Sequence, residues 1–450
     1  MLSVLVGREY QSTKKKIATI LALAIPAVIE NFLQTAVGFV DTMFVSKLGI
    51  TSVTAVGVSN TILGVYMAVF MALGVGTSSL IARSVGAGEL DRAREIAKQS
   101  TWVAIVLGLV LGLITLFFAE PLLRIMGAES KVLDEAALYF RIVAIPTVLI
   151  ALMFIAGSIL RATGDTVSPM KVTMWINILH IPLDYLLIFG IGPFEGFGIA
   201  GAAWATVIVR LIGTVALYRI IRRSKVSFPF VEGFAFRNRR DITGLLKLST
   251  PTAIERLVMR LGQVLYFGLI VRISTETFAA HTIAGSIEQF SYMPGYGLAI
   301  AATTLVGQNI GAKREKDAYS YGMLTAWIGV GIMSVFGILF LFLLSPWFAA
   351  WFTTDNEVSQ MVVSALRIAT FAQPFVALSF VLAGALQGLG DTKSPMYSTA
   401  VGMWVIRVIG VYVLAIIFDL GIVGVWLSFA FDNFARAIFL LFRFKSKFPH

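Results

Sequence analysis

The stretch LIARSVGA at residues 80–87 recurs as LVGQNIGA at residues 305–312, and this repetition decides the fold. Two further stretches repeat at nearly the same spacing: PAVIE at 26–30 returns as PTAIE at 251–255, and GDTVSPM at 164–170 returns as GDTKSPM at 390–396. The offset is 225 residues for the first two stretches and 226 for the third. The chain therefore contains two copies of one unit, an internal symmetry typical of membrane transporters.

The composition places both copies in a membrane. Hydrophobic residues make up 58% of the chain, charged residues only 14%, and the mean hydropathy is +0.85. Apolar runs long enough to cross a bilayer recur along the chain, at about 17–44, 53–82, 98–119, 136–158, 169–191, 199–221, 244–272, 278–306, 319–344, 359–386, 396–418 and 422–442. Six spans per copy is an even number, so both copies enter the membrane from the same side as parallel repeats.

These patterns predict an all-α integral membrane protein with 12 transmembrane helices in two pseudo-symmetric six-helix bundles. We expect an N-terminal lobe over 1–221, a cytoplasmic linker over 222–243 and a C-terminal lobe over 244–450. The first apolar run is too long and too polar for a cleavable signal peptide, so we assign it as the first span. The chain has no cysteine, which excludes disulfides and cysteine-bound metals.

The net charge of +11 is distributed on one side of the predicted membrane, so it is a topology signal and not a nucleic-acid footprint. The bases cluster before the first span and in the segments after spans 2, 6, 8 and 12, as Arg8, Lys14–Lys16, Arg92, Arg94, Lys98, Arg222, Arg223, Lys225, Arg237, Arg239, Arg240, Lys313, Arg314, Lys316, Arg443, Lys445 and Lys447. We therefore expect a multi-pass protein of the inner (cytoplasmic) membrane with both termini in the cytoplasm. Contact of these bases with lipid headgroups is the lesser interpretation.

The repeated glycine motifs favour helix ends over nucleotide binding. Glycine after a span suits a left-handed cap, and the Asp, Thr and Ser before Pro169 and Pro395 suit the start of the next helix. None of these motifs has the spacing of a phosphate-binding loop, and no metal-binding or catalytic signature is present. We expect neither an ATP site nor a resident cofactor or metal, and a membrane-embedded enzyme is disfavoured.

Acids inside two apolar spans of the first copy are the main candidates for function. Glu30, Gln34 and Asp41 share one face of span 1, and Asn177, His180 and Asp184 share one face of span 5. A charge at this depth costs several kcal/mol, roughly 2.5–3.5. Burial and like charge both favour the protonated form of a carboxyl group, so Asp41 and Asp184 could exchange a proton or bind a small cation. Hydrogen-bonded, inert contacts between helices are the alternative.

The second copy does not repeat the acid pair. Tyr266 stands at the position equivalent to Asp41, and the equivalent of Asp184 falls near Ile409 and Gly410. Its own polar residues read mainly as ion pairs of Arg with Glu between helices, with substrate contact as the alternative for Glu288; they are Glu255, Arg256, Arg260, Gln263, Glu288, Gln289 and Arg407. Methionines such as Met153, together with aromatic side chains, would suit a cavity for bulky apolar cations.

The chain resembles the multidrug and toxic compound extrusion (MATE) family over nearly its whole length. The most specific stretches are 34–49 (QTAVGFVDTMFVSKLG), 55–57, 80–86, 164–169, 279–281 and 301–312, and span 1 with Asp41 and span 5 with Asp184 are similar to the DinF-like branch. The resemblance implies two six-helix lobes in a V around a central cavity, and export of cationic drugs in exchange for H⁺ or Na⁺. It also implies coupling through Asp41 and Asp184 and bending of span 1 at Pro26.

Two departures from the branch bear on the coupling ion. Branch members often read Asn-x-x-x-Asp-Pro on span 5, where this chain has His180 and Tyr185. The missing amide oxygen weakens a Na⁺ site and favours H⁺, although Asn177 lies one turn earlier. The expected partners are small organic cations and membrane lipids, and the expected state is a monomer. A lipid or lipid-linked-sugar flippase of the same superfamily remains an alternative, although its cavity would be expected to carry several cations.

Overall fold

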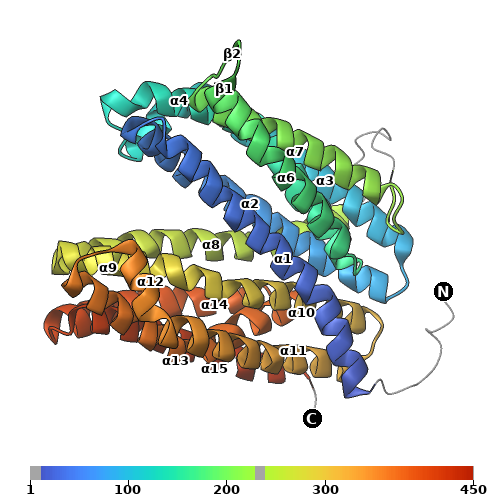
Figure 1. Ribbon diagram of the computed structural model, residues 1–450. Helices are drawn as coiled ribbons and strands as arrows, with labels where there is room; N and C mark the ends of the chain where they lie inside the picture. The colour runs from blue at the N-terminus through green and yellow to red at the C-terminus, as the bar shows by residue number, and fades with distance from the viewer. Residues whose placement is uncertain (1–11, 229–238, 449–450) are drawn as a thin grey trace.

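The computed structural model describes residues 12–228 and 239–448, which form two helical bundles that meet at one end and diverge toward the other (Figure 1). The predicted linker falls largely on 229–238, outside the described residues. The first bundle contains α1 (Thr13–Ser46), α2 (Ile50–Gly86), α3 (Leu90–Ile125), α4 (Ser130–Ala144), α5 (Val148–Ala162), α6 (Val167–Phe189), the short antiparallel hairpin β1 (Gly190–Ile191) and β2 (Phe194–Glu195), and α7 (Ile199–Ile221). The second bundle contains α8 (Arg239–Ile273), α9 (Thr275–Glu288), η1 (Gln289–Tyr292), α10 (Met293–Gly311), α11 (Glu315–Phe336), η2 (Gly337–Leu343), α12 (Ser345–Phe352), α13 (Asn356–Gly388), α14 (Lys393–Val401), η3 (Gly402–Val408), η4 (Val411–Ile417) and α15 (Gly421–Lys445).

The described helices confirm the predicted membrane fold. Nine of them are long and apolar enough to cross a bilayer, and the pair α4 and α5, bent by 45°, adds a tenth span. The remaining two predicted spans are α8, which carries several charged residues, and the segment α9–η1–α10, which is broken by a short 3₁₀ turn. Large apolar side chains such as Phe39, Phe117 and Phe371 remain at least 70% exposed, as expected of a surface that faces lipid.

The two copies of the repeat fold alike, and the structure locates the residue that changes their offset. Pro121 in α3 and Pro346 in α12 keep the offset of 225, whereas α4 begins at Ser130 and α13 at Asn356, an offset of 226. The extra residue therefore lies in the turn that precedes α13. There Asp355 caps the helix by accepting hydrogen bonds from the backbone of Glu357 and Val358, at 2.8 and 3.2 Å.

Helix α1 packs against both bundles. Its first half contributes Ile20, Leu23 and Ala24 to a hydrophobic cluster with Leu298 and other residues of the second bundle, whereas its second half packs against α6 of the first. Pro26 lies where α1 passes from one bundle to the other, and the helix continues through it without a break. The predicted lobe boundaries stay a prediction. The start of α1, which belongs to the predicted N-terminal lobe, packs mainly against the second bundle.

The repeated glycines join the two bundles where α2 and α10 end. A Cβ atom at Gly86 would overlap the carbonyl oxygen of Gln308, and one at Gly311 would overlap that of Arg83. Gln308 also donates a hydrogen bond to the carbonyl of Ala162 at 3.0 Å. The sequence pattern assigned these glycines to helix termination, and the left-handed residue that ends α2 is Gly88, at φ 76°. Gly86 and Gly311 instead allow the backbones of the two bundles to touch.

We expect Gly311→Ala to separate α2 from α10 by about 2 Å, because nonbonded carbon atoms need about 3.5 Å. The chain lacks cysteine, so nitroxide labels at Ala87→Cys and Lys313→Cys would measure the separation directly by pulsed electron resonance. Gly331→Ala in α11 is the matched control, since nothing lies within 4 Å of its Cβ position. Equal label distances in Gly311→Ala and Gly331→Ala would contradict the close contact.

The loop between α13 and α14 is fastened to the end of α15. Asp391 pairs with Lys447 at 2.9 Å and with Arg443 at 3.3 Å, and it accepts a hydrogen bond from the backbone of Ser394 at 3.0 Å. Burial would raise the pKa of Asp391, but the hydrogen bonds from Lys447 and Ser394 outweigh burial and hold this pKa below its usual value. The stabilisation is present above the unfolded-state pKa and is lost as the pH falls through the folded-state pKa.

Candidate functional site: a charged cavity between the bundles

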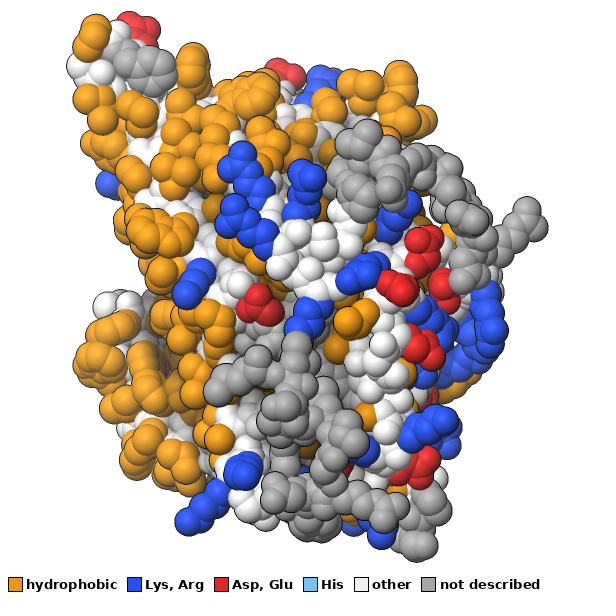
Figure 2. Space-filling model, turned by 90° about the vertical axis from the view of Figure 1, so that its right-hand side faces the viewer, with side chains coloured by type: hydrophobic (Ala, Val, Ile, Leu, Met, Phe, Trp, Pro, Cys, Tyr) orange, Lys and Arg blue, Asp and Glu red, His pale blue; other side chains and the backbone are white. Residues whose placement is uncertain are grey.

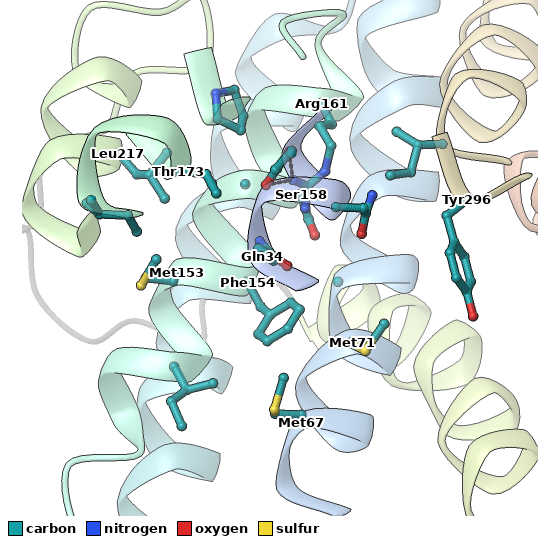
Figure 3. Close-up of a pocket in the computed structure, with 18 of the residues that line it drawn as sticks. Gln34, Met67, Met71, Met153, Phe154, Ser158, Arg161, Thr173, Leu217 and Tyr296 are labelled. Carbon is teal, nitrogen blue, oxygen red and sulfur yellow. Dashed lines mark hydrogen bonds and ion pairs between the residues drawn. The ribbon is translucent and has the colours of Figure 1, made fainter. Parts of the chain in front are cut away.

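A cavity of about 560 Å³ lies within the first bundle and is bordered by the second. Helices α1, α2, α5, α6 and α7 form most of its wall, and residues of α8, α10 and α13 complete the rim. Figure 3 shows Met67 and Met71 of α2 near Phe154 of α5, with Gln34 above them and Tyr296 of α10 at the side of the second bundle. The volume falls within the range of about 300–1,000 Å³ that is usual for small-molecule sites.

The two predicted acidic stripes converge at this cavity. Asp41 on α1 and Asp184 on α6 lie within hydrogen-bonding reach of each other, and His180 Nδ1 is 3.8 Å from Asp41 Oδ1. Asn177, one turn before His180, also lines the cavity. Two carboxyl groups can share a hydrogen bond only when one of them carries a proton. The arrangement therefore suits a site whose charge changes with proton uptake.

Glu30 forms an ion pair with an arginine that the sequence pattern did not single out. Arg161 Nη1, on α5, lies 3.1 Å from both carboxylate oxygens of Glu30. The side chains are only 15% and 10% exposed, so the two charges compensate each other inside the protein. Arg161 lies just beyond the predicted span 136–158, which is why it was not counted as an intramembrane charge.

Two further arginines line the cavity and were not assigned to it from the sequence. Arg210 comes from α7, in the same cavity as Asp41, and Arg256 comes from α8 on the side of the second bundle. Within residues 12–228 and 239–448, Arg210 Nη1 and Arg256 Nε are buried and have no hydrogen-bond partner. Arg210 could have been noticed as a charged residue in the middle of the apolar run 199–221.

The remaining predicted residues occupy different places. Gln34 and Met153 line the cavity, as expected of residues that contact a substrate. Glu288 is not part of the lining; it is 4% exposed inside the second bundle, where Gln373 donates a hydrogen bond to it at 3.5 Å. Pro26 lies in α1, one turn before Glu30. No group of three or more His, Asp or Glu residues that could hold a metal ion is found in the described part of the chain.

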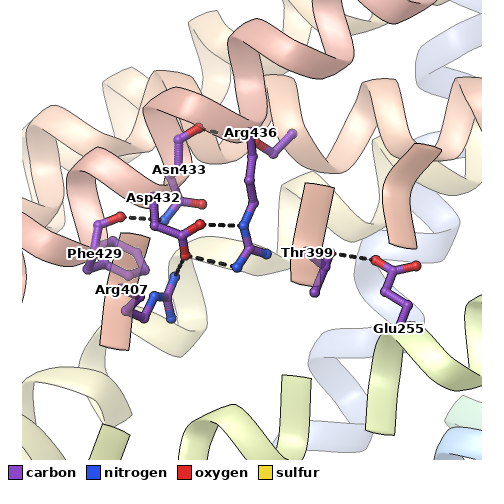
Figure 4. A network of polar contacts seen from close by, with 8 residues as sticks. Glu255, Thr399, Arg407, Phe429, Asp432, Asn433 and Arg436 are labelled. Carbon is purple, nitrogen blue, oxygen red and sulfur yellow. Dashed lines mark hydrogen bonds and ion pairs between the residues drawn. The ribbon is translucent and has the colours of Figure 1, made fainter. Parts of the chain in front are cut away.

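The second bundle contains a buried charge network centred on Asp432 (Figure 4). Arg407 Nη2 lies 2.7 Å from Asp432 Oδ2, and Arg436 binds both oxygens at 2.5 and 2.9 Å. The sequence pattern predicted Arg–Glu pairs here, whereas Glu255 accepts a hydrogen bond from Thr399 at 2.8 Å. The acid that Arg407 uses is Asp432, which could have been noticed four residues before Arg436 in the last apolar run.

Two repeated six-helix bundles around an internal cavity with buried ionisable groups define a polytopic secondary transporter. The sequence model of the MatE family matches residues 26–186 and 251–413, once in each repeat. The chain therefore belongs to the MATE family, whose members are membrane transporters and not enzymes.

Relatives and solved structures agree with this family over nearly the whole chain. A "probable multidrug resistance protein NorM" of Thermotoga maritima is 30% identical over 95% of this chain and 92% of its own length. An "uncharacterized transporter YisQ" of Bacillus subtilis is 27% identical over 96% of this chain and 95% of its own. A structure described as the outward-facing conformation of a multidrug resistance MATE family transporter superposes with a TM-score of 0.89 at 25% identity, covering 96% of each chain.

Proposed function

We propose that the protein exports small organic cations or drugs in exchange for protons. The observation that carries this proposal is the meeting of Asp41 and Asp184 beside a cavity of drug-like volume. Relatives named as multidrug resistance proteins support the substrate class. Met67, Met71 and Phe154 offer adaptable apolar and aromatic contacts to a bulky ligand.

The coupling follows from a shared site. With at least one of Asp41 and Asp184 ionised, the cavity attracts the cationic group of the substrate. Protonation from outside removes this attraction, and α1 repacks near Pro26 as the substrate leaves. Glu30, one turn after Pro26, would carry its partner Arg161 into this movement. Because protons and substrate favour different conformations, each drives the other across the membrane.

A proton fits this site better than Na⁺. Hard metal cations prefer several oxygen ligands, yet the turn that precedes Asp184 presents His180, an imidazole, beside Asp41. Asn177 Nδ2 has no hydrogen-bond partner among the described residues, so the amide is free to reorient. The DinF-like branch, the monomeric state and contact with membrane lipids accompany the proposal as further predictions.

The charge distribution supports an orientation with both termini in the cytoplasm of an inner membrane. Lysine and arginine side chains gather on the end of the molecule that faces the viewer in Figure 2, which is the end where the two bundles meet in Figure 1. The first and last helices, α1 and α15, begin and end there respectively. Positive charge marks the cytoplasmic side of membrane proteins. The bundles would then diverge toward the outside.

Purified protein in liposomes tests the function and the coupling ion together. We expect a fluorescent lipophilic cation to be concentrated against its gradient when a pH difference of about two units is imposed, and not when a sodium gradient replaces it. A response to sodium alone would mean that Asp41, Asn177 and Asp184 bind a metal ion. No response to either gradient would reject the antiport proposal.

A lipid flippase is the second candidate, and the arginines of the cavity favour it. Arg161, Arg210 and Arg256 all line the cavity, and several cations are what the cavity of a flippase would be expected to carry. Arg161 is neutralised by Glu30, which leaves two arginines for an anionic headgroup. Translocation of a fluorescent anionic lipid by the purified protein, without any drug, would support this candidate over drug export.

A further inference from the structure

The cavity carries both signs of charge in separate places. Glu30 and Arg161 cancel each other through their direct ion pair. Asp41 and its neighbour Asp184 then form the acidic side of the cavity, while Arg210 and Arg256 supply positive charge. A ligand with only a positive charge would be attracted by the acids and repelled by two guanidinium groups in the same space.

Arg210 and Arg256 differ in whether an acidic group of the protein compensates their positive charge. Arg210 lies in the electrostatic field of Asp41, within the same bundle. Arg256 stands on α8, across the rim, and forms no ion pair among the described residues. Its neighbour Glu255 is engaged by Thr399. A buried guanidinium nitrogen without an acceptor is costly, so an anionic ligand group at Arg256 would be stabilised there.

We propose that the substrate is amphoteric, with its cationic group beside Asp41 and an anionic group, such as a carboxylate, bound by Arg256. Its apolar body lies between these ends against Met67, Met71 and Phe154. This inference rests on the proposed export function and narrows its substrate class. Because Asp41 belongs to the first bundle and Arg256 to the second, such a ligand bridges the two and links its own binding to their relative orientation.

A matched pair of dyes tests the charge requirement without any variant. Rhodamine B carries a delocalised cation and a carboxylate, and its ethyl ester keeps the cation but loses the negative charge. We expect fluorescence anisotropy of the dyes with purified protein in detergent to show rhodamine B binding about tenfold more tightly than the ester, equivalent to about 1.4 kcal/mol. Equal affinity, or tighter binding of the ester, would overturn the proposal.

Substitution of Arg256 identifies the residue responsible. Arg256→Gln is expected to weaken rhodamine B binding about tenfold and to leave the ester unaffected, whereas Arg256→Lys retains part of the preference. Arg260→Gln is the control, because Arg260 lies one turn further along α8, is exposed and does not line the cavity. Equal loss of binding for both dyes in Arg256→Gln would reveal a structural role and contradict the assignment.

Export of the ester separates this inference from the antiport proposal. Liposomes that concentrate the ester under a pH gradient, combined with equal binding of the two dyes, would reject the amphoteric substrate and leave proton-coupled export standing. Liposomes that move neither dye would reject the export function. The binding comparison would still show whether the cavity recognises an anionic group through Arg256.

Discussion

Asp41→Asn is expected to abolish proton-driven export while the protein still folds and inserts. Asparagine has nearly the same shape as aspartate but neither carries a negative charge nor takes up a proton at this position. One proton moved down a difference of about two pH units can support an accumulation of about 100-fold, since each unit is worth about 1.4 kcal/mol. We therefore expect the accumulation ratio in liposomes to fall from that order to near one.

Two comparisons complete the test of Asp41. Asp134→Asn makes the same chemical change at an exposed acid of α4, and it should transport as the unaltered protein does. The thermal unfolding temperature of Asp41→Asn in detergent should be unchanged or slightly raised, because a costly intramembrane charge has been removed. Full accumulation of the dye by a folded Asp41→Asn protein would show that proton coupling lies elsewhere.

Asp432→Asn is expected to destabilise the protein severely. Asp432 is completely buried and binds Arg407 and Arg436, so its loss leaves two guanidinium groups without their acid. Breaking a buried ion pair by removing one partner costs about 3–5 kcal/mol, against a total stability of about 5–15 kcal/mol for a typical domain. When the Asp432→Asn protein is heated and then passed over a size-exclusion column, little folded protein should remain.

Two controls distinguish the effect of the unpaired arginine charges in Asp432→Asn from the effect of changing an aspartate side chain. Replacing all three charges together, as Asp432→Leu with Arg407→Met and Arg436→Met, should recover much of the stability, because no unpaired charge is then buried. Asp355→Asn should be nearly neutral, since asparagine caps a helix as well as aspartate does. An unfolding temperature of Asp432→Asn equal to that of Asp355→Asn would contradict the structural role of the network.

The sequence predicted most clearly those features that can be recognised without knowing which residues they contact in the fold. The repeat predicted two bundles, and the apolar run 244–272 predicted α8 as a span although its charged residues lower its hydropathy. Asp41 and Asp184 stood out because an acid in an apolar run is costly wherever its partner lies. The break between α9 and α10, where Pro294 starts α10, was not predicted, because the apolar run 278–306 was assigned as one span.

Features that depend on contacts between distant segments could not be predicted in this way. The polar residues of the second copy suggested ion pairs of Arg with Glu between helices, but Arg256 lines the cavity while Thr399 donates a hydrogen bond to Glu255. The sequence could suggest that Gly86 and Gly311 end helices, but it could not show that the two helix ends meet. The π-helical turns η3 and η4 likewise depend on packing, and no residue pattern in the sequence predicted them.

If the two bundles rotate against each other, the close contact at Gly86 and Gly311 is their fulcrum. Helix α2 has 37 residues, which corresponds to a lever of about 55 Å at 1.5 Å per residue. A rotation of about 10° around the contact would displace the far end by about 10 Å while the glycines barely move. Probes attached at Ile50 and Thr275, the exposed first residues of α2 and α9, would therefore detect rotations too small to register at the fulcrum itself.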